Sequence, residues 1–243
     1  NDLEYLEKTL KETKDQYQTR LVIIDGVYSQ DGDLSLLPEI ISLCKTHEAM
    51  LMLDDAHGIG VMGANGRGTA EHFNCLGQVD IITGTFSKSF GCVGGFAAAS
   101  KKIIQYLKFY ADSNVFSAAP TPQVTASILK ALEIIKKEPA IRARLWENTD
   151  YLRSRLTTEG FDIGKSVSPI FPIMIRDNKK VYEIAKMLQE KGIFTIGIVY
   201  PAVRTKEARL RVSVLATHEH EQLDALINAL NDINKDIKIK KEQ

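Results

Sequence analysis

The amino-acid sequence predicts an α/β protein, with a mostly parallel sheet flanked by helices and a smaller C-terminal α+β domain. Two observations support this prediction. Short apolar runs alternate with helical segments through the first half of the chain, which is typical of parallel sheets. Beyond Pro120 and Pro122 the pattern changes to two long helices, then to a mixture of strands and helices. We therefore expect one domain over residues 1–139 and a second over residues 140–243.

The first domain is expected to contain four strands, each a short apolar run. The strands are expected at residues 20–29, 49–58, 79–91 and 94–100, and helices at residues 3–17, 37–48 and 101–112. The first helix places Leu3, Leu6 and Leu10 on one stripe. Pro38 marks the first turn of the second helix, where its missing N–H removes no hydrogen bond.

The second domain begins with the two long helices and continues with three expected strands. The helices are expected at residues 122–138, 143–160, 179–192 and 219–235, and the strands at residues 168–176, 192–203 and 208–216. The tail after residue 235 is rich in lysine, and we expect it to be a frayed, solvated end.

Composition excludes several classes of protein. The 243 residues carry 31 basic and 31 acidic side chains, so the net charge gives no electrostatic footprint for a nucleic acid. No apolar run approaches the roughly 20 residues of a membrane span. Cys44, Cys75 and Cys92 have neither metal-type spacing nor a disulfide pattern. We expect a cytoplasmic protein from a reducing compartment, with no nucleic-acid partner, no metal and no integral membrane segment.

Three of the expected strands end in polar residues, and parallel strands bring such ends to one edge of a sheet. The polar end of the first strand is Ser29, that of the second is residues 54–57 and that of the third is residues 85–88. Lys88 lies in the loop GTFSKSFG, where partial desolvation would favour Schiff-base chemistry; a surface lysine is the alternative. Thr85, Ser87 and the amides around Gly84 suit a phosphate, although no nucleotide P-loop frame is present.

The second strand ends in Asp54, Asp55 and His57. Two acids at the end of a buried strand need partners, and one could accept a hydrogen bond from a protonated ring nitrogen. Turn-capping acids beside a satisfied histidine are the alternative, and a metal site is a weaker one. A Schiff-base lysine, a phosphate cradle and an acid for a ring nitrogen together describe pyridoxal 5'-phosphate (PLP).

Three long motifs carry a more specific resemblance. They are DGVYSQDGDLSLLPEI, MLDDAHGIGVMGANGRGTAEHF and VDIITGTFSKSFGCVGGFAAAS, supported by FSAAPTP and ARLRVSVLATH. The chain resembles, over essentially its whole length, the α-oxoamine synthase family of fold-type I PLP enzymes. That family includes serine palmitoyltransferase, glycine C-acetyltransferase (2-amino-3-ketobutyrate CoA ligase), 8-amino-7-oxononanoate synthase and 5-aminolevulinate synthase.

The resemblance implies roles for the cofactor-binding residues. Lys88 would form the Schiff base and later move protons at the substrate α-carbon, and Asp54 would pair with the pyridine nitrogen. His57 would lie at the phenolic oxygen of the cofactor, with Ser29 near the same edge. Thr85, with Ser87 in the same loop, would hold the phosphate.

Two further residues are implied by the same resemblance. Ser117 would reach the phosphate from a partner subunit, because the family's active sites lie at a homodimer interface. Arg211 matches the arginine that binds the amino-acid carboxylate, for which a guanidinium fork is well suited. Without the resemblance, an ion pair at a strand edge would be the simpler reading of Arg211.

The activity that follows is a decarboxylating condensation of a small amino acid, serine or glycine, with an acyl-CoA to give a 2-amino ketone. The run from LKALEII to NTDY and the motif ATHEHEQLD favour a serine palmitoyltransferase, whereas GIVYPAV and ARLRVSV also suit glycine C-acetyltransferase and the oxononanoate synthase. A non-catalytic partner subunit and a cofactor-free Schiff-base lyase are the alternatives from other classes. The family's chains carry a further segment before the position of Asn1, so we expect an N-terminally truncated chain.

Overall fold

The computed structural model describes residues 1–240, which form two compact units. The first unit contains Asn1–Tyr28 and Leu34–Pro139. The second contains Ser29–Asp33 and the chain from Ala140 onward. A short segment near residue 30 thus belongs with the second unit, although it lies inside the range expected for the first domain.

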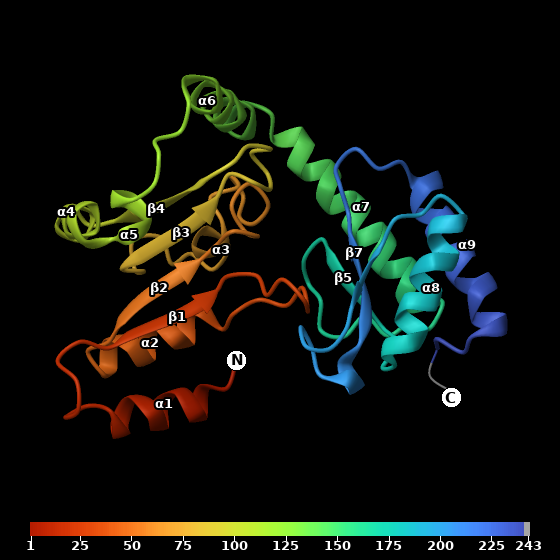
Figure 1. The fold of residues 1–243 in the computed structure, drawn as a ribbon, viewed down its shortest axis with the longest axis horizontal. Helices are drawn as coiled ribbons and strands as arrows, with labels where there is room; N and C mark the ends of the chain where they lie inside the picture. The colour runs from red at the N-terminus through yellow and green to blue at the C-terminus, as the bar shows by residue number, and fades with distance from the viewer. Residues whose placement is uncertain (241–243) are drawn as a thin grey trace. The chain divides into compact units, whose positions relative to one another are not determined.

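The first unit is built on a four-stranded sheet of order β1-β2-β3-β4 (Figure 1). Its strands are β1 (Leu21–Asp25), β2 (Met50–Asp54), β3 (Ile81–Thr85) and β4 (Gly95–Ala99). The pairs β1–β2 and β2–β3 are parallel, and β4 runs antiparallel to β3. This arrangement confirms the expected α/β fold with a mostly parallel sheet.

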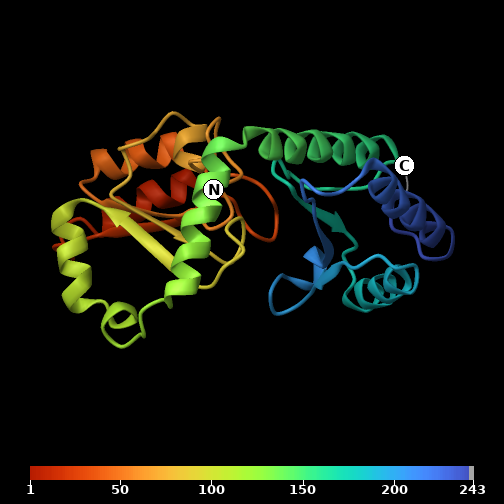
Figure 2. The same cartoon turned by 90° about the horizontal axis from the view of Figure 1, so that it is seen from above.

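Six helices accompany this sheet. They are α1 (Leu3–Glu12), α2 (Leu37–Thr46), α3 (Thr69–His72), α4 (Lys101–Tyr110), α5 (Asp112–Val115) and α6 (Pro122–Lys137). Pro38 lies in the first turn of α2, as expected. Figure 2 shows α2 lying over one face of the sheet. Leu3 and Leu6 of α1 pack against the apolar cluster that α2 forms with β2.

The two faces of the sheet differ in how well they are covered. On β2, Leu51 and Leu53 point into the core beneath α2, and both are at most 1% exposed. Side chains alternate between faces along a strand, so Met50, Met52 and Asp54 lie on the other face. That second face is open on β1, where Ile23 is 61% exposed.

The second unit contains a three-stranded antiparallel sheet of order β5-β7-β6. Its elements are α7 (Pro139–Thr158), β5 (Ile170–Met174), α8 (Asn178–Glu190), β6 (Ile196–Ile198), the 3₁₀ turn η1 (Thr205–Glu207), β7 (Arg209–Ser213) and α9 (His220–Asp236). One apolar core joins α7, α8 and α9 to this sheet, with Phe171, Leu210 and Ile227 fully buried at its centre.

The chain directly after α9 is not frayed, which differs from the prediction. Ile239 is 8% exposed, and Lys240 Nζ donates to Asn231 Oδ1 at 2.8 Å and stands 4.7 Å from the centre of the Phe161 ring. Buried contacts therefore fix this segment as far as residue 240. The rest of the predicted frayed tail, residues 241–243, lies outside the described residues.

No helix within residues 1–240 has the length and apolar character needed to cross a bilayer.

Candidate active site

A row of polar side chains crosses the first sheet where its parallel strands end. Asp25 on β1 is the register partner of Asp54 on β2, and Asp54 is the partner of Thr83 on β3. Register partners in neighbouring strands share a face of the sheet, so the three side chains stand side by side on the open face. Carboxyl ends of parallel strands are the usual place for ligands in such sheets.

Asp54 ends β2 on this open face and is half-buried. Its Oδ1 accepts a hydrogen bond from the backbone N–H of Ala56 at 3.0 Å, which fixes the orientation of the carboxylate. The predicted acid for a ring nitrogen thus lies at the edge of the sheet where it was expected, held by the turn that follows it.

Asp25 was not among the residues singled out from the sequence. Burial raises the pKa of its carboxyl, the negative charge of Asp54 raises it further, and the positive charge of Lys88 partly opposes both. The signal that would have found it is the repeated pattern of an apolar strand ending in an acid, because VIID on β1 matches LMLD on β2.

Lys88 lies in the loop that joins β3 to β4. The two strands stay paired through Thr85 and Gly95, and one further bond runs from Phe86 N to Gly94 O at 2.9 Å. Lys88 is exposed at the surface of this loop, and its carbonyl accepts from Gly91 N at 3.0 Å.

A hydrogen bond ties the lysine loop to the turn after β2. Ser89 Oγ donates to the backbone carbonyl of Ile59 at 2.7 Å. His57 lies in that turn and is half-buried. The structure therefore brings the lysine loop next to the segment that carries Asp54 and His57.

Thr85 and Ser87 form the predicted phosphate-binding pair. Their hydroxyl oxygens lie 2.7 Å apart, and Ser87 N donates to Thr85 Oγ1 at 3.1 Å. Thr85 Oγ1 also lies 3.2 Å from Gly94 O, so its proton can point there while Ser87 supplies the proton between the two hydroxyls. The two hydroxyls can rotate away from these internal partners and donate to an oxyanion beside the lysine instead.

Asp55, the second acid of the pair, lies on the opposite face from Asp54. Its side chain is fully buried and accepts hydrogen bonds from Thr69 N at 2.7 Å and Thr69 Oγ1 at 2.5 Å. The weaker alternative of a metal site is not supported, because no group of His, Cys, Asp and Glu side chains in the described chain is arranged to hold a metal ion.

Ser117 follows α5 in a stretch without regular structure, and it is exposed. Within the first unit it takes part in no hydrogen bond with the other predicted site residues. Its predicted role in a partner's site therefore stays a prediction.

Ser29 and Arg211 lie together in the second unit. Arg211 Nε donates to the carbonyl of Ser29 at 2.6 Å, and Arg211 Nη1 donates to Ser213 Oγ at 3.0 Å. Burial lowers the pKa of the Arg211 guanidinium. The alternative of an ion pair at a strand edge is wrong, because β7 is the central strand and the described partners of Arg211 are a carbonyl and a hydroxyl.

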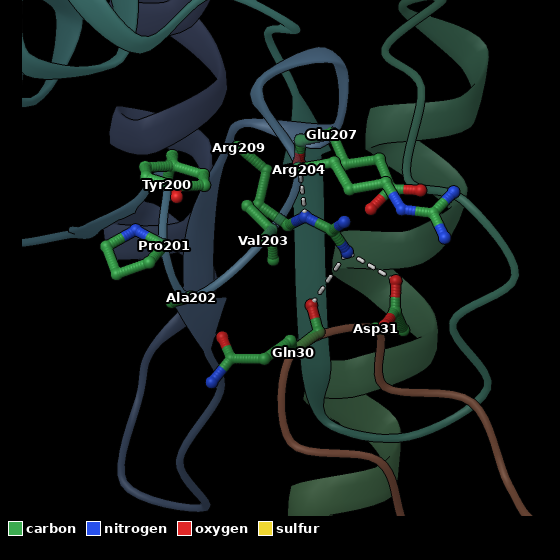
Figure 3. A pocket seen from close by; sticks show the side chains of 9 residues that line it. All are labelled: Gln30, Asp31, Tyr200, Pro201, Ala202, Val203, Arg204, Glu207 and Arg209. Carbon is green, nitrogen blue, oxygen red and sulfur yellow. Dashed lines mark hydrogen bonds and ion pairs between the residues drawn. The ribbon is translucent and has the colours of Figure 1, made fainter.

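A polar cavity of about 430 Å³ lies beside these residues in the second unit (Figure 3). Its lining residues are Gln30, Asp31, Tyr200, Pro201, Ala202, Val203, Arg204, Glu207 and Arg209. Arg209 is 3% exposed and donates to Asp31 Oδ1, to Gln30 O and to Glu207 O. None of the predicted site residues lines this cavity. Its polar contacts are the ion pair between Arg209 and Asp31 and the bonds from Arg209 to two backbone carbonyls.

Comparison with known proteins identifies relatives. A profile described as "Aminotransferase class I and II" matches residues 1–230. The chain is 42% identical over 98% of its length to 8-amino-7-oxononanoate synthase from Thermoanaerobacter pseudethanolicus, and 43% identical over 98% to serine palmitoyltransferase from Sphingobacterium spiritivorum. In both cases it spans 60% of the relative's length.

Solved structures resemble the chain as well. A serine palmitoyltransferase variant from S. paucimobilis, with bound PLP-myriocin aldimine, superposes with a TM-score of 0.92 at 29% identity over 98% of this chain and 60% of its own. An 8-amino-7-oxononanoate synthase from Francisella tularensis gives 0.78 at 25% identity over 95% and 67%. These matches confirm the resemblance to the α-oxoamine synthases. Since the profile covers nearly the entire sequence, the chain belongs to the aminotransferase class I and II family.

Proposed function

We propose that the chain is part of a PLP-dependent acyltransferase, an α-oxoamine synthase that condenses a small amino acid with an acyl-CoA. CoA and carbon dioxide leave, and a 2-amino ketone is formed. The observation that supports this most directly is the hydrogen bond from Ser89 to Ile59, because it holds the Lys88 loop beside the turn that carries Asp54 and His57.

The residues of the first unit fit the cofactor. The hydroxyls of Thr85 and Ser87, which can rotate to donate to an oxyanion, suit its phosphate. Asp54 offers a carboxylate for a protonated ring nitrogen. Thr83 Oγ1, in the same polar row, is buried and has no hydrogen-bond partner within the described chain, which is expected where a bound group completes the site.

When bound, PLP supplies an electron sink that stabilises negative charge at the amino-acid α-carbon. The proposed role of Asp54 is to keep a proton on the ring nitrogen, and that of His57 is to donate to the phenolic oxygen. Lys88 would hold the cofactor and would move the proton at the α-carbon. Its exposed position in a short, anchored loop allows the amine to reach a ligand without displacing core residues.

Further roles are proposed for residues outside this cluster. Arg211 would bind the amino-acid carboxylate through the guanidinium N–H groups not used by its bonds to Ser29 and Ser213, and Ser29 would contact the cofactor edge. Ser117 would complete the phosphate site of a partner subunit in a homodimer. We propose that the first unit is the C-terminal part of the cofactor-binding large domain, that the second unit is the small domain, and that the protein is cytoplasmic.

Serine palmitoyltransferase is the preferred activity. The higher TM-score of the serine palmitoyltransferase structure, 0.92 against 0.78, supports it. The second candidate is 8-amino-7-oxononanoate synthase, supported by a sequence identity of 42%, close to the 43% of the palmitoyltransferase. Glycine C-acetyltransferase is the third. The alternative of another class, a non-catalytic partner subunit, gives no reason for a lysine in the Lys88 loop.

The test is the visible spectrum of the protein at its native length, titrated with PLP and then treated with borohydride. We expect a yellow Schiff base that borohydride fixes onto Lys88. Lys88→Ala should stay colourless, whereas Lys101→Ala, at an exposed lysine on α4, should behave like the wild type. A colourless wild type would refute the catalytic proposal and favour the partner-subunit alternative.

A coloured protein would then be assayed for CoA release with serine and with glycine, across acyl-CoAs of increasing chain length. Turnover of serine with long chains supports the palmitoyltransferase, and turnover of glycine with acetyl-CoA supports the C-acetyltransferase. Turnover of neither amino acid, but of another with an acyl-CoA, supports the oxononanoate synthase.

A further inference from the structure

We propose that the buried pair Asp55–Thr69 is a positioning device, which holds the backbone between Asp54 and His57 in the orientation that binds the cofactor. This inference rests on the proposed function, because it concerns the same turn. Neither residue of the pair touches the open face where the cofactor is proposed to bind, so both would act through their neighbours.

The alternation of β2 places the two acids differently. Leu51, Leu53 and Asp55 form one buried series, whereas Met50, Met52 and Asp54 form the half-buried series on the open face. Asp55 therefore occupies a position that would suit an apolar core residue. A hydrophobic residue there would avoid the free-energy penalty of burying a carboxylate, so a carboxylate at this point needs a reason beyond stability.

The surroundings of Asp55 fix its carboxylate from several sides. Thr69, itself fully buried, donates both its N–H and its hydroxyl to the two carboxylate oxygens. Three glycines close the cradle. A methyl group added at Gly58 or Gly68 would lie 1.9 Å from a carboxylate oxygen, and one at Gly26 would lie 2.5 Å away. The carboxylate thus has a single position available.

The backbone of Asp55 transmits this constraint to the proposed site. Its N–H donates to Thr83 O at 2.9 Å, which extends the β2–β3 pairing one residue beyond β2. Its carbonyl accepts from Gly58 N and Ile59 N, both at 3.0 Å, and so begins the turn that contains His57. Ile59 in turn accepts from Ser89 in the lysine loop. A rotation at residue 55 would therefore move the carboxylate before it, the histidine after it and the lysine loop.

The pKa of the Asp55 carboxyl reflects a balance between burial and the Thr69 donors. Burial raises the pKa of the Asp55 carboxyl, and the two bonds from Thr69 lower it again in part. Asp54 is the nearby charge and raises it slightly. The Thr69 donors thus favour the ionised, fixed carboxylate against its desolvation.

The test compares a graded series at Thr69 in the protein at its native length. Thr69→Ser keeps the hydroxyl donor, Thr69→Cys replaces it by a weak donor of similar size, and Thr69→Val removes it. Thr149→Val is the matched control, because Thr149 is also fully buried and its hydroxyl donates to Leu145 O in the second unit. Each variant is titrated with PLP while the visible spectrum is recorded across pH, and its Tm is measured.

For Thr69→Val we expect the Kd for PLP to rise about tenfold, which corresponds to about 1.4 kcal/mol, and the pH midpoint of the visible band to shift. The band should report Asp54 and His57 because both are proposed to contact ring atoms. Thr69→Ser should match the wild type, Thr69→Cys should fall between, and Thr149→Val should lower Tm without changing the Kd or the midpoint.

Three results would overturn the inference. If Thr69→Val and Thr149→Val lose Tm alike and both keep the wild-type Kd and midpoint, Thr69 is only structural and the proposed function stands. If Thr69→Val does not fold, the comparison of Thr69→Ser with Thr69→Cys decides the question. Equal Kd values for PLP and equal pH midpoints for these two variants would refute the inference. A wild type that binds no PLP refutes the proposed function and this inference together.

Discussion

Gly58→Ala tests whether the Asp55 carboxylate is as immobile as its surroundings indicate. Gly58 has an ordinary negative φ, so alanine causes no backbone strain there. The added methyl would, however, lie 1.9 Å from Asp55 Oδ1 and 2.6 Å from Thr69 Oγ1. A carbon and an oxygen normally approach to about 3.3 Å, so the carboxylate would have to move by more than about 1 Å.

The magnitude follows from what that movement breaks. Both bonds from Thr69 are short, and hydrogen bonds to a charged group contribute about 1.5–3 kcal/mol each. We therefore expect Gly58→Ala to lower the free energy of unfolding by about 2–5.5 kcal/mol, after about 0.4–1 kcal/mol is returned by the stiffer unfolded chain. Gly77→Ala is the contrasting case. Its φ is +78° and nothing lies within 4 Å of the added methyl, so backbone strain alone should cost about 1–2 kcal/mol.

The assay is urea unfolding followed by circular dichroism, with midpoint and slope compared for both variants and the wild type. A loss for Gly58→Ala that is no larger than that for Gly77→Ala would refute the reasoning. It would show that the carboxylate can be displaced at little cost, and the argument that Asp55 has a single position would fail with it.

Three further predictions concern other residues. Folding raises the pKa of the Asp25 carboxyl, so the wild-type protein gains stability from protonation at low pH and loses this gain as pH rises. The Asp25→Asn variant should therefore become steadily more stable than the wild type in urea unfolding as pH rises above about 4. A pH-independent difference contradicts this. Arg209→Met should lower the free energy of unfolding by about 2–4 kcal/mol, because it removes a buried donor to three oxygens. Asp31→Asn should lower it by only about 1 kcal/mol, because the Asp31 side chain is 55% exposed. Equal losses in urea unfolding would refute the view that Arg209 is the structural partner of this pair. Burial raises the pKa of the Cys44 thiol to about 11, so at pH 8 a thiol reagent should label Cys44 only when urea is present. Peptide mass spectrometry measures the labelling, and rapid labelling of Cys44 in the folded protein would contradict the prediction.

Much of the fold could be predicted because the first half of the chain repeats one signal. Each strand is a short apolar run followed by polar residues, and each helix between them has its own apolar stripe, as Leu3, Leu6 and Leu10 have in α1. The lysine loop and the acidic turn were found for the same reason, since polar residues at strand ends stand out against apolar runs.

The different roles of Asp54 and Asp55 could not be predicted in the same way. The run before them, MLML, is apolar at every position, so its sequence does not tell which face of the strand packs beneath α2. Only the folded structure shows that Leu53 packs in the core beneath α2, and that Asp55, two residues later, therefore points to the same buried face. Its partner Thr69 is 14 residues away along the chain, beyond the range of any local pattern. The fixed end at Ile239 was missed because a lysine lies on each side of it in the sequence.

The second unit is assembled from two stretches of chain that are far apart in sequence. Ser29–Asp33 is held there by the Arg209 and Arg211 side chains and by Val167 N, which donates to Gly32 O at 3.1 Å. A gene fragment cut between residues 139 and 140 would omit these five residues. Arg209 would then lose its counter-ion Asp31 and the carbonyl of Gln30, and Val167 would lose its acceptor.

This arrangement makes residues 29–33 a structural insert that the second unit borrows from the other half of the polypeptide. A recombinant second unit should therefore become more resistant to proteolysis when the sequence SQDGD is fused to it through a flexible linker. A swap of small domains between relatives should, for the same reason, carry this pentapeptide together with everything after residue 139.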